Sequence, residues 1–258
     1  MSHQVSTLDV RGTSVRTFRG GTGRRILFLH GGAGLAAWTP FFDAMSGVGD
    51  FMAVEHPGFG QSDTPAAIGS MSDLAYFYLD LIEQEGLEDF HLIGNSLGGW
   101  LASEIAIRNC ARLASLTLIA PSGLYDPANP TANPFALSYD DNTRILFKNP
   151  AIADKILSAP VDAAALKNQV KNNMAVARLG GQNNISNPDL GKWLHRIRVP
   201  SLIVWGDSDA LNPPSYADTW ANLIPGSVRK IIPDAGHLPH AEQPQVTAEA
   251  ISGFLQSV

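Results

Sequence analysis

A serine between two glycines has the setting in this chain that best suits covalent chemistry. Ser96 lies in the pentapeptide GNSLG at 94–98, between a short apolar run at 90–93 and a stretch with helical spacing at 97–108. A nucleophile at a sharp strand-to-helix turn has a strained backbone, and glycine neighbours avoid the clashes that larger residues would make there. Taken alone, the pattern also fits a glycine-rich turn that carries a solvated serine.

An aspartate and a histidine follow two later apolar runs. Asp209 ends the segment WGDSD, and His237 ends the segment DAGH. In an open parallel sheet, the loops at the carboxyl ends of the strands meet in one crevice, so Ser96, Asp209 and His237 could converge there. A serine hydroxyl is a poor nucleophile until a base takes its proton, and that base needs a carboxylate to fix its tautomer.

A glycine-rich loop offers a second element of such chemistry. The segment HGGAG at 30–34 directly follows the apolar run at 25–29. Free backbone N–H groups in a loop of this kind can hold an anion, although a plain flexible turn is the other interpretation.

These residues need a sheet that brings strand ends together, and the chain has the matching pattern. Short apolar runs alternate with helical patterns, which favours a mostly parallel sheet with helices on both faces. Strands are expected at residues 5–10, 14–19, 25–29, 51–54, 90–93, 113–120, 201–205 and 228–232. The first two alternate in period two and predict an antiparallel hairpin at a sheet edge. Helices are expected at residues 39–47, 71–85, 97–108, 216–223 and 243–255.

Strand signals are missing between Pro121 and Pro200, and this block interrupts the alternating pattern. We therefore predict a core formed by residues 1–122 and 197–258, with a helical cap inserted at 123–196. Four helical patterns fall within the predicted cap, at residues 140–148, 151–157, 162–179 and 188–196. The third is expected to stop at Gly180-Gly181.

Bulk composition excludes several classes of function. The 258 residues are 45% apolar and 16% charged, with a net charge of −6, so nucleic acid and anionic membrane surfaces are poor partners. No signal-peptide pattern opens the chain and no apolar run approaches the ~18 residues of a membrane span, so we expect a cytoplasmic protein. Cys110 is the only cysteine, which forbids an internal disulfide, and it is expected to be buried on the helix after Ser96.

The sequence resembles the alpha/beta-hydrolase superfamily, in its group with a helical cap. The similar segments follow the expected order: HGGAG at 30–34, HPGFGQS at 56–62, GNSLGG at 94–99, WGDSD at 205–209 and GHLPHAEQP at 236–244. This resemblance implies an eight-stranded, mostly parallel sheet with helices on both faces and an inserted cap. It implies neither a metal nor an organic cofactor, because three side chains supply the nucleophile, base and charge stabilisation.

The resemblance also assigns roles to the three reactive residues. It implies Ser96 as the nucleophile, His237 as the general base and Asp209 as the acid that orients the imidazole, in the chain order of this fold. Asp207 remains the alternative acid, although the family pattern of Trp-Gly, two residues and then Asp favours Asp209.

Two backbone N–H groups are implied as the oxyanion hole. They are those of Gly32 and Leu97, with Ala33 as the alternative to Gly32 because the register of the loop is open. One departure from the family is Glu55, where many relatives have Asp before the HPGFGQS turn. That residue is usually structural.

Other histidines have simpler interpretations. His30 is expected to brace its loop, and His56 to belong to a turn. His240 is a candidate for the rim of the substrate site. His3, His91 and His195 are interpreted as surface or capping residues.

The resemblance leaves several activities open. Cleavage of an ester or lactone of a small, largely apolar substrate is the first expectation. Asn95 beside Ser96 is also found in hydrolases that cut carbon–carbon bonds of vinylogous diketone ring-fission products. Those enzymes also have a Trp after the catalytic His, where this chain has Leu238, and a cap arginine, for which Arg144 and Arg178 are available. A small-molecule receptor with little turnover is the third possibility.

The expected partner is a small-molecule substrate, and both a monomer and a homodimer fit the sequence. Residues expected to line its pocket are Gly31, Asn95, Leu124, Phe135, Phe147, Trp193 and Leu238. Apolar cap residues of this kind can also simply pack the cap onto the core.

Overall fold

One eight-stranded sheet organises the computed structural model, which describes residues 2–127, 129–160, 162–180 and 183–258. The strands are β1 (His3–Val10), β2 (Thr13–Gly20), β3 (Arg25–Leu29), β4 (Asp50–Val54), β5 (Phe90–Asn95), β6 (Leu113–Ile119), β7 (Ser201–Gly206) and β8 (Val228–Ile232). Their order is β1-β2-β4-β3-β5-β6-β7-β8, and among these strands the β1–β2 and β2–β4 pairs are antiparallel while the others are parallel. All the predicted strands are therefore present, and the edge hairpin is confirmed.

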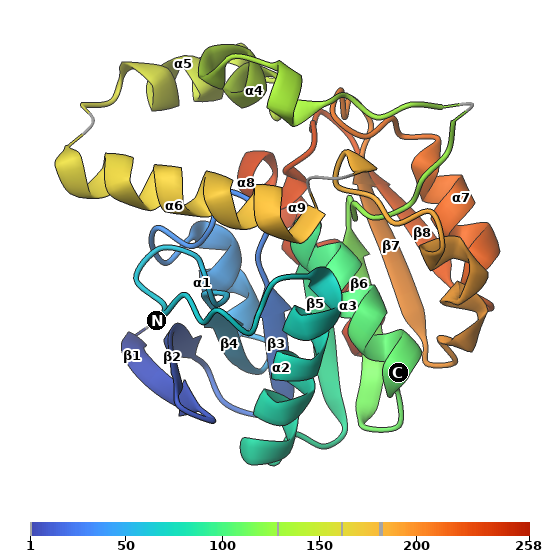
Figure 1. The fold of residues 1–258 in the computed structure, drawn as a ribbon. Coiled ribbons are helices and arrows are strands. Elements are labelled where there is room, and N and C mark those ends of the chain that lie inside the picture. Colours follow the sequence, from blue (N-terminus) through green and yellow to red (C-terminus); the bar gives the residue numbers. More distant parts are fainter. Residues whose placement is uncertain (1, 128, 161, 181–182) are drawn as a thin grey trace.

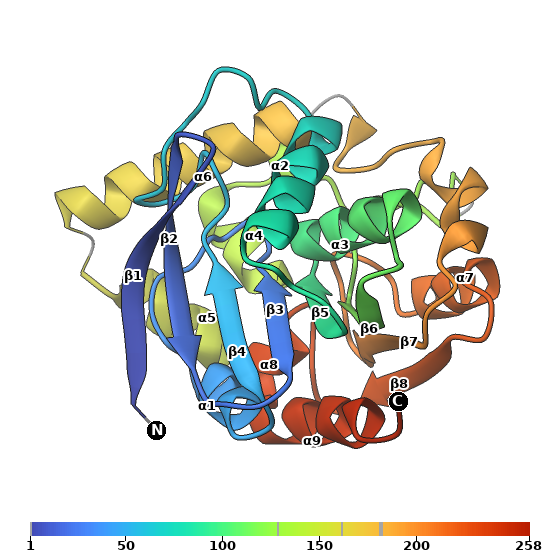
Figure 2. The ribbon, with the colours of Figure 1, turned by 90° about the horizontal axis from the view of Figure 1, so that it is seen from below.

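Helices cover both faces of the sheet (Figure 2). One face is covered by α1 (Pro40–Ser46), α8 (Pro239–Glu242) and α9 (Pro244–Leu255), and the other by α2 (Met71–Gln84), α3 (Leu97–Arg108) and α7 (Tyr216–Leu223). Each layer encloses its own cluster of buried apolar side chains. The central strands are buried on both faces, which explains why they appear in the sequence as continuous apolar runs.

The strand register brings the reactive loops together. Leu29 at the end of β3 lies opposite Gly94 in β5, and Asn95 at the end of β5 lies opposite Ile119 in β6. Ile119 in turn lies opposite Val204 in β7. Because these strands are parallel, the loops that leave them begin side by side at one edge of the sheet.

Between β6 and β7 the chain forms a separate helical layer over that edge (Figure 1). It contains η1 (Pro134–Ala136), α4 (Tyr139–Ile145), α5 (Pro150–Ser158), α6 (Ala163–Gly180), η3 (Leu190–Lys192) and η4 (Leu194–Arg196), where η marks a 3₁₀-helix. Ser138 and Asn149 accept hydrogen bonds at the N-termini of α4 and α5, which fixes where those helices begin. Of the predicted Gly180-Gly181 stop, Gly180 is the last residue of α6 and Gly181 lies outside the described residues.

The prediction of a helix at residues 188–196 is wrong. This stretch forms two 3₁₀ turns, η3 and η4, joined at Trp193. Pro188 precedes it and Gly191 interrupts it, and both residues disfavour a continuous α-helix. Leu190 and Leu194 are nevertheless both buried. Their spacing of four residues is also typical of one face of a helix.

Two further expectations need correction. His91 is not a surface residue, because β5 is buried along its whole length and the imidazole Nδ1 lies 2.8 Å from Ser115 Oγ. Burial lowers the pKa of His91 to about 4. Cys110 is only partly buried and lies beyond α3, since Asn109 is already extended. Within the described ranges, every helix is too short or too polar to cross a membrane.

Candidate active site

Ser96 lies at the sharp corner between β5 and α3. Its φ of 52° and ψ of −117° are unfavourable for a residue with a side chain, as expected for a nucleophile held in a strained turn. A Cβ on Gly98 would lie 2.1 Å from the carbonyl oxygen of Leu29, and one on Gly94 would lie 2.2 Å from that of Gly98. The glycines are therefore needed for α3 to begin against the end of β3.

The structure places the serine, histidine and aspartate in one hydrogen-bonded chain. Ser96 Oγ lies 2.8 Å from His237 Nε2, and His237 Nδ1 lies 2.8 Å from Asp209 Oδ2. The other carboxylate oxygen of Asp209 accepts the backbone N–H groups of Leu211 and Asn212, each at 2.9 Å. His237 and Asp209 are buried, so water does not compete for these bonds. The arrangement can move a proton from the hydroxyl to the imidazole.

Asp207 points elsewhere. Its carboxylate accepts hydrogen bonds from the backbone of Asp234 and Ala235 and from the hydroxyl of Ser208. These bonds tie the β7 loop to the β8 loop, which supports the place of His237 without touching its ring. The geometry therefore favours Asp209 over Asp207 as the partner of the imidazole.

The glycine-rich loop after β3 passes directly beside Ser96. A Cβ on Gly31 would lie 3.2 Å from Ser96 Cβ. The backbone N–H groups of Gly32 and Leu97 donate to no oxygen in the part of the chain that the structure describes. They are therefore available to a negative charge that develops next to Ser96 Oγ.

Two stacked histidines hold this loop from below. His30 donates from Nδ1 to the carbonyl oxygen of Gly31 at 2.7 Å, and its Nε2 accepts the backbone N–H of His56 at 2.9 Å. The rings of His30 and His56 stack at 3.7 Å, and Tyr78 donates its hydroxyl to His56 Nδ1. Burial lowers the pKa of His30 to about 4 and that of His56 well below its usual value. The predicted bracing role of His30 is thus confirmed.

Glu55 organises the neighbouring turn at 56–62. One of its oxygens accepts the backbone N–H groups of Gln61 at 2.7 Å and Ser62 at 3.0 Å, and the other pairs with the partly buried Arg16. Gly60 lies so close to this carboxylate that any Cβ there would overlap it. Glu55, which stands where many relatives have Asp, therefore has the structural role that we expected.

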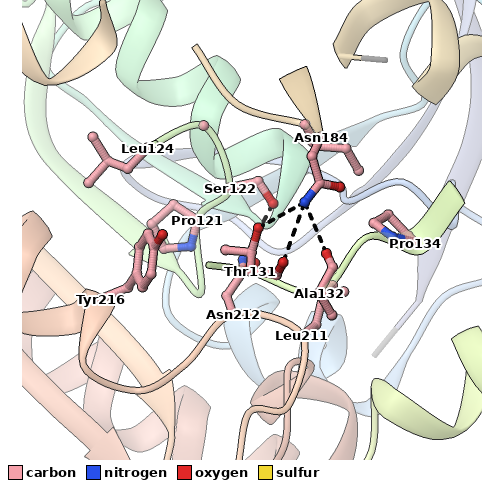
Figure 3. A pocket seen from close by; sticks show the side chains of 12 residues that line it. Pro121, Ser122, Leu124, Thr131, Ala132, Pro134, Asn184, Leu211, Asn212 and Tyr216 are labelled. Atoms are coloured by element: carbon pink, nitrogen blue, oxygen red, sulfur yellow. Dashed lines mark hydrogen bonds between the residues drawn. The ribbon is translucent and has the colours of Figure 1, made fainter. Parts of the chain in front are cut away.

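A small cavity of about 20 Å³ (Figure 3) lies next to Ser96. Ser122 connects the two, because its Oγ lies 3.4 Å from Ser96 Oγ. The cavity mixes apolar and uncharged polar side chains, with no ionisable group other than a tyrosine among its described lining residues. Those residues are Pro121, Ser122, Gly123, Leu124, Thr131, Ala132, Pro134, Asn184, Ile185, Leu211, Asn212 and Tyr216.

One of the predicted pocket residues, Leu124, lines this cavity. Phe147 and Leu238 are partly buried and are not among its lining residues. Asn95 is different, since it is only 2% exposed and donates from Nδ2 to the carbonyl oxygen of Ile119. Its expected place in the pocket lining is wrong, because the side chain supports the strand end beneath the Gly31 loop.

Other predicted residues lie away from the cavity. Trp193 lines a separate groove of about 750 Å³ between α2, α3 and the end of α6, which Arg178 also lines. Phe135 is 45% exposed and does not line the cavity beside Ser96. His240 does not reach the rim, since its ring packs against Phe28 and Phe41 and burial lowers its pKa to about 4.

Sequence reasoning missed the polar side chains of the cavity. Ser122 follows the end of β6, so the rule that located the other loops also applied to it. Asn184 has no comparable signal, because its amide reaches Thr131 and Ala132 across the cap (Figure 3). Such contacts depend on the path of a long insertion and not on a local pattern.

Comparison with known proteins places this geometry in a family. The model of the alpha/beta hydrolase family matches residues 26–250. The chain is 27% identical over 246 residues to the dihydrolipoyllysine-residue acetyltransferase component of the acetoin cleaving system of Cupriavidus necator, covering 91% of this chain but only 64% of that protein. It is 26% identical to the 2-hydroxy-6-oxononadienedioate/2-hydroxy-6-oxononatrienedioate hydrolase of Paraburkholderia phymatum, covering 98% of this chain and 95% of the relative.

A solved structure has the same fold. The carboxylesterase CesB of Bacillus subtilis superposes with a TM-score of 0.79 at 22% identity, covering all of this chain and 93% of the esterase. The predicted sheet, the predicted resemblance and the predicted enzyme class, a hydrolase, are confirmed by these matches. The chain belongs to the alpha/beta hydrolase family.

Proposed function

We propose that this protein is a serine hydrolase that cleaves an ester or lactone through an acyl-enzyme at Ser96. The observation that carries the proposal is the continuous hydrogen-bonded chain from Ser96 through His237 to Asp209. Ser96 Oγ attacks the substrate carbonyl while His237 Nε2 takes the hydroxyl proton. Asp209 keeps the proton of the ring on Nδ1, so Nε2 is free to accept.

The following steps use the same groups. The N–H groups of Gly32 and Leu97 stabilise the oxyanion, and collapse of the intermediate expels the alcohol oxygen, which receives the proton from His237. Water then attacks the acyl-enzyme, again giving its proton to His237. The carboxylic acid leaves as Ser96 recovers its hydrogen.

The surroundings of Ser96 support a small, uncharged substrate. The adjoining cavity is lined by apolar and neutral polar side chains. Of the two cap arginines, Arg144 is half exposed and paired with Asp154, and Arg178 lies against Gly58 in the wall of the separate groove. A carboxylate on the substrate would therefore meet neither arginine in this arrangement.

Carbon–carbon bond hydrolysis is the second candidate. It is supported by the Paraburkholderia phymatum relative, whose name denotes a hydrolase of dioates and which matches nearly the full chain. The positions of Arg144 and Arg178 speak against such a substrate, as does the buried, hydrogen-bonded side chain of Asn95.

A burst experiment distinguishes these candidates. Wild type and Ser96→Ala are mixed with short and medium p-nitrophenyl esters and, in parallel, with a vinylogous diketone ring-fission product. We expect a burst and steady release of p-nitrophenol from wild type alone. Turnover of the diketone with silence on all esters would select the carbon–carbon hydrolase. Binding without turnover of either class would instead indicate a receptor.

A further inference from the structure

The carboxylate of Glu242 connects the loop of the catalytic histidine to the cap. Its Oε2 accepts the backbone N–H of Gly236, the residue before His237, at 2.5 Å. The same oxygen accepts the backbone N–H of Lys148 at 3.2 Å, and Oε1 accepts that of Asn149 at 2.9 Å. One side chain thus holds two segments that are almost ninety residues apart in the chain.

A second bond joins the same two segments. The backbone N–H of His237 donates to the carbonyl oxygen of Leu146 in the turn between α4 and α5, at 2.9 Å. The turn packs directly against Gly236. A Cβ on Gly236 would lie 2.8 Å from the carbonyl oxygen of Leu146 and 2.9 Å from the backbone nitrogen of Lys148. The segment 146–149 therefore supports the backbone on which the imidazole is carried.

Side-chain charge at this junction is a weaker link. Lys148 Nζ lies 2.8 Å from Asp234 Oδ1, but the two side chains are 39% and 77% exposed. Exposed ion pairs of this kind contribute little to stability, because water and salt screen the two charges. The charge-assisted bonds from backbone N–H groups to the Glu242 carboxylate are the stronger contacts.

We propose that Glu242 is a positioning residue for His237. Through the hydrogen bonds of Glu242, the position of the cap turn 146–149 determines the orientation of the imidazole. The proposal rests on the serine hydrolase function proposed above. Glu242 touches neither substrate nor the reacting atoms, and it acts by fixing Gly236 and the neighbouring backbone. When the turn is seated, His237 Nε2 faces Ser96 Oγ, and when the turn is displaced, the proton acceptor loses that alignment.

The test uses Glu242→Gln, which keeps the size of the side chain. An amide has one acceptor oxygen, so its NH₂ group must face an N–H donor on one of the two segments. We measure the rate constant and the end-point stoichiometry of Ser96 labelling by a fluorophosphonate, which needs the serine and its base but no particular acyl group. We expect the rate constant to fall at least tenfold while labelling still reaches completion. A fraction of misfolded protein would lower the end point instead.

Two matched controls accompany this variant. Glu249→Gln changes an exposed glutamate on α9, and Lys148→Met removes the exposed ion pairs of Lys148 with Asp234 and Asp207 but leaves the backbone N–H that Glu242 accepts. Both are expected to stay within twofold of wild type. In proton NMR spectra, the downfield signal of the His237 Nδ1–H should broaden in Glu242→Gln and persist in both controls.

The possible results separate the two proposals. If wild type is not labelled and Ser96→Ala behaves identically, the serine hydrolase function fails and this inference fails with it. If wild type is labelled and folded Glu242→Gln reacts within twofold, only the positioning role is overturned. Should Glu242→Gln not fold, Glu242→Asp retains the charge with a shorter reach, and an unchanged labelling rate in that variant would also overturn the role.

Discussion

At the scale of single residues, the site distinguishes two aspartates that are only two positions apart. Asp209 faces the imidazole with one oxygen and is fixed through the other by Leu211 and Asn212. Asp207 accepts hydrogen bonds from the neighbouring loop and from Ser208, and it lies 3.7 Å from Lys148 Nζ. Equal charge in nearly the same place therefore has different consequences, because only one carboxylate determines which ring nitrogen carries the proton.

Asp209→Asn should lower kcat/KM by about 10⁴-fold, whereas Asp207→Asn should cost less than about tenfold. An asparagine amide can donate to His237 Nδ1, which leaves the ring proton on Nε2. Protonated Nε2 cannot accept the proton of the Ser96 hydroxyl. The measurement is steady-state hydrolysis of the best p-nitrophenyl ester by both variants. A larger loss for Asp207→Asn than for Asp209→Asn would show that Asp209 is not the acid.

Residue types at strand ends made much of this site predictable. Ser96, Asp209 and His237 each follow an apolar run, and parallel strands bring such positions to one edge. Ser122 and Asn184 were not predicted, although Ser122 follows the end of β6 as the other loop residues follow their strands. Asn184 lines the cavity because the insertion folds back toward it. Trp193 shows the opposite error, since an aromatic residue in the cap lines a different groove.

At the scale of elements, the strands were the most predictable part because their apolar runs are bounded by glycines, prolines and charges. The stretch at 188–196 was misassigned because a spacing of four between Leu190 and Leu194 occurs in both α and 3₁₀ segments of this length. The contact between the loops after β3 and β4 was not visible in the sequence. It depends on buried histidines that hold each other in place.

The buried histidines should make the stability of the protein fall as the pH decreases from about 6.5 to about 4. The pKa of His30 is lowered from 6.5 to about 4 by burial, and those of His91 and His240 are lowered similarly. Between these values, the unfolded chain binds protons that the folded chain excludes, so stability is retained above pH 6.5 and lost below it. Each histidine contributes at most about 1.4 kcal/mol per pH unit.

Urea unfolding at pH 7.5, 6, 5 and 4.5 measures this slope. His30→Gln should be less stable than wild type at neutral pH but should lose less stability on acidification. His195→Gln, at an exposed position, should have the wild-type slope. Parallel curves for His30→Gln and wild type would show that protonation of His30 does not contribute.

At the scale of the whole molecule, the helical layer between β6 and β7, the predicted cap, is bound to the rest of the chain through polar contacts at the edge of the sheet that carries Ser96. Asn172 in α6 accepts the backbone N–H of Gly60 and donates to the carbonyl oxygen of Ala33, both at 2.8 Å. Lys171 donates to the carbonyl oxygens of Gly60 and Ser62. The loop after β3 and the turn after β4 are thus held both by α6 and by the stacked histidines.

Asn172→Ala should loosen the cap without removing any reactive group. The change leaves Gly60 N–H and Ala33 C=O without their partner, at a cost of roughly 1–3 kcal/mol. We expect Tm to fall by about 2–12 °C, KM for a p-nitrophenyl ester to rise several-fold, and proteolysis between β6 and β7 to accelerate. Asn173→Ala is the matched control, since Asn173 is exposed on the same turn and should change stability by less than about 0.5 kcal/mol. Equal effects of the two substitutions would mean that α6 is held by its apolar contacts alone, and that the polar bridge contributes nothing to the seating of the cap.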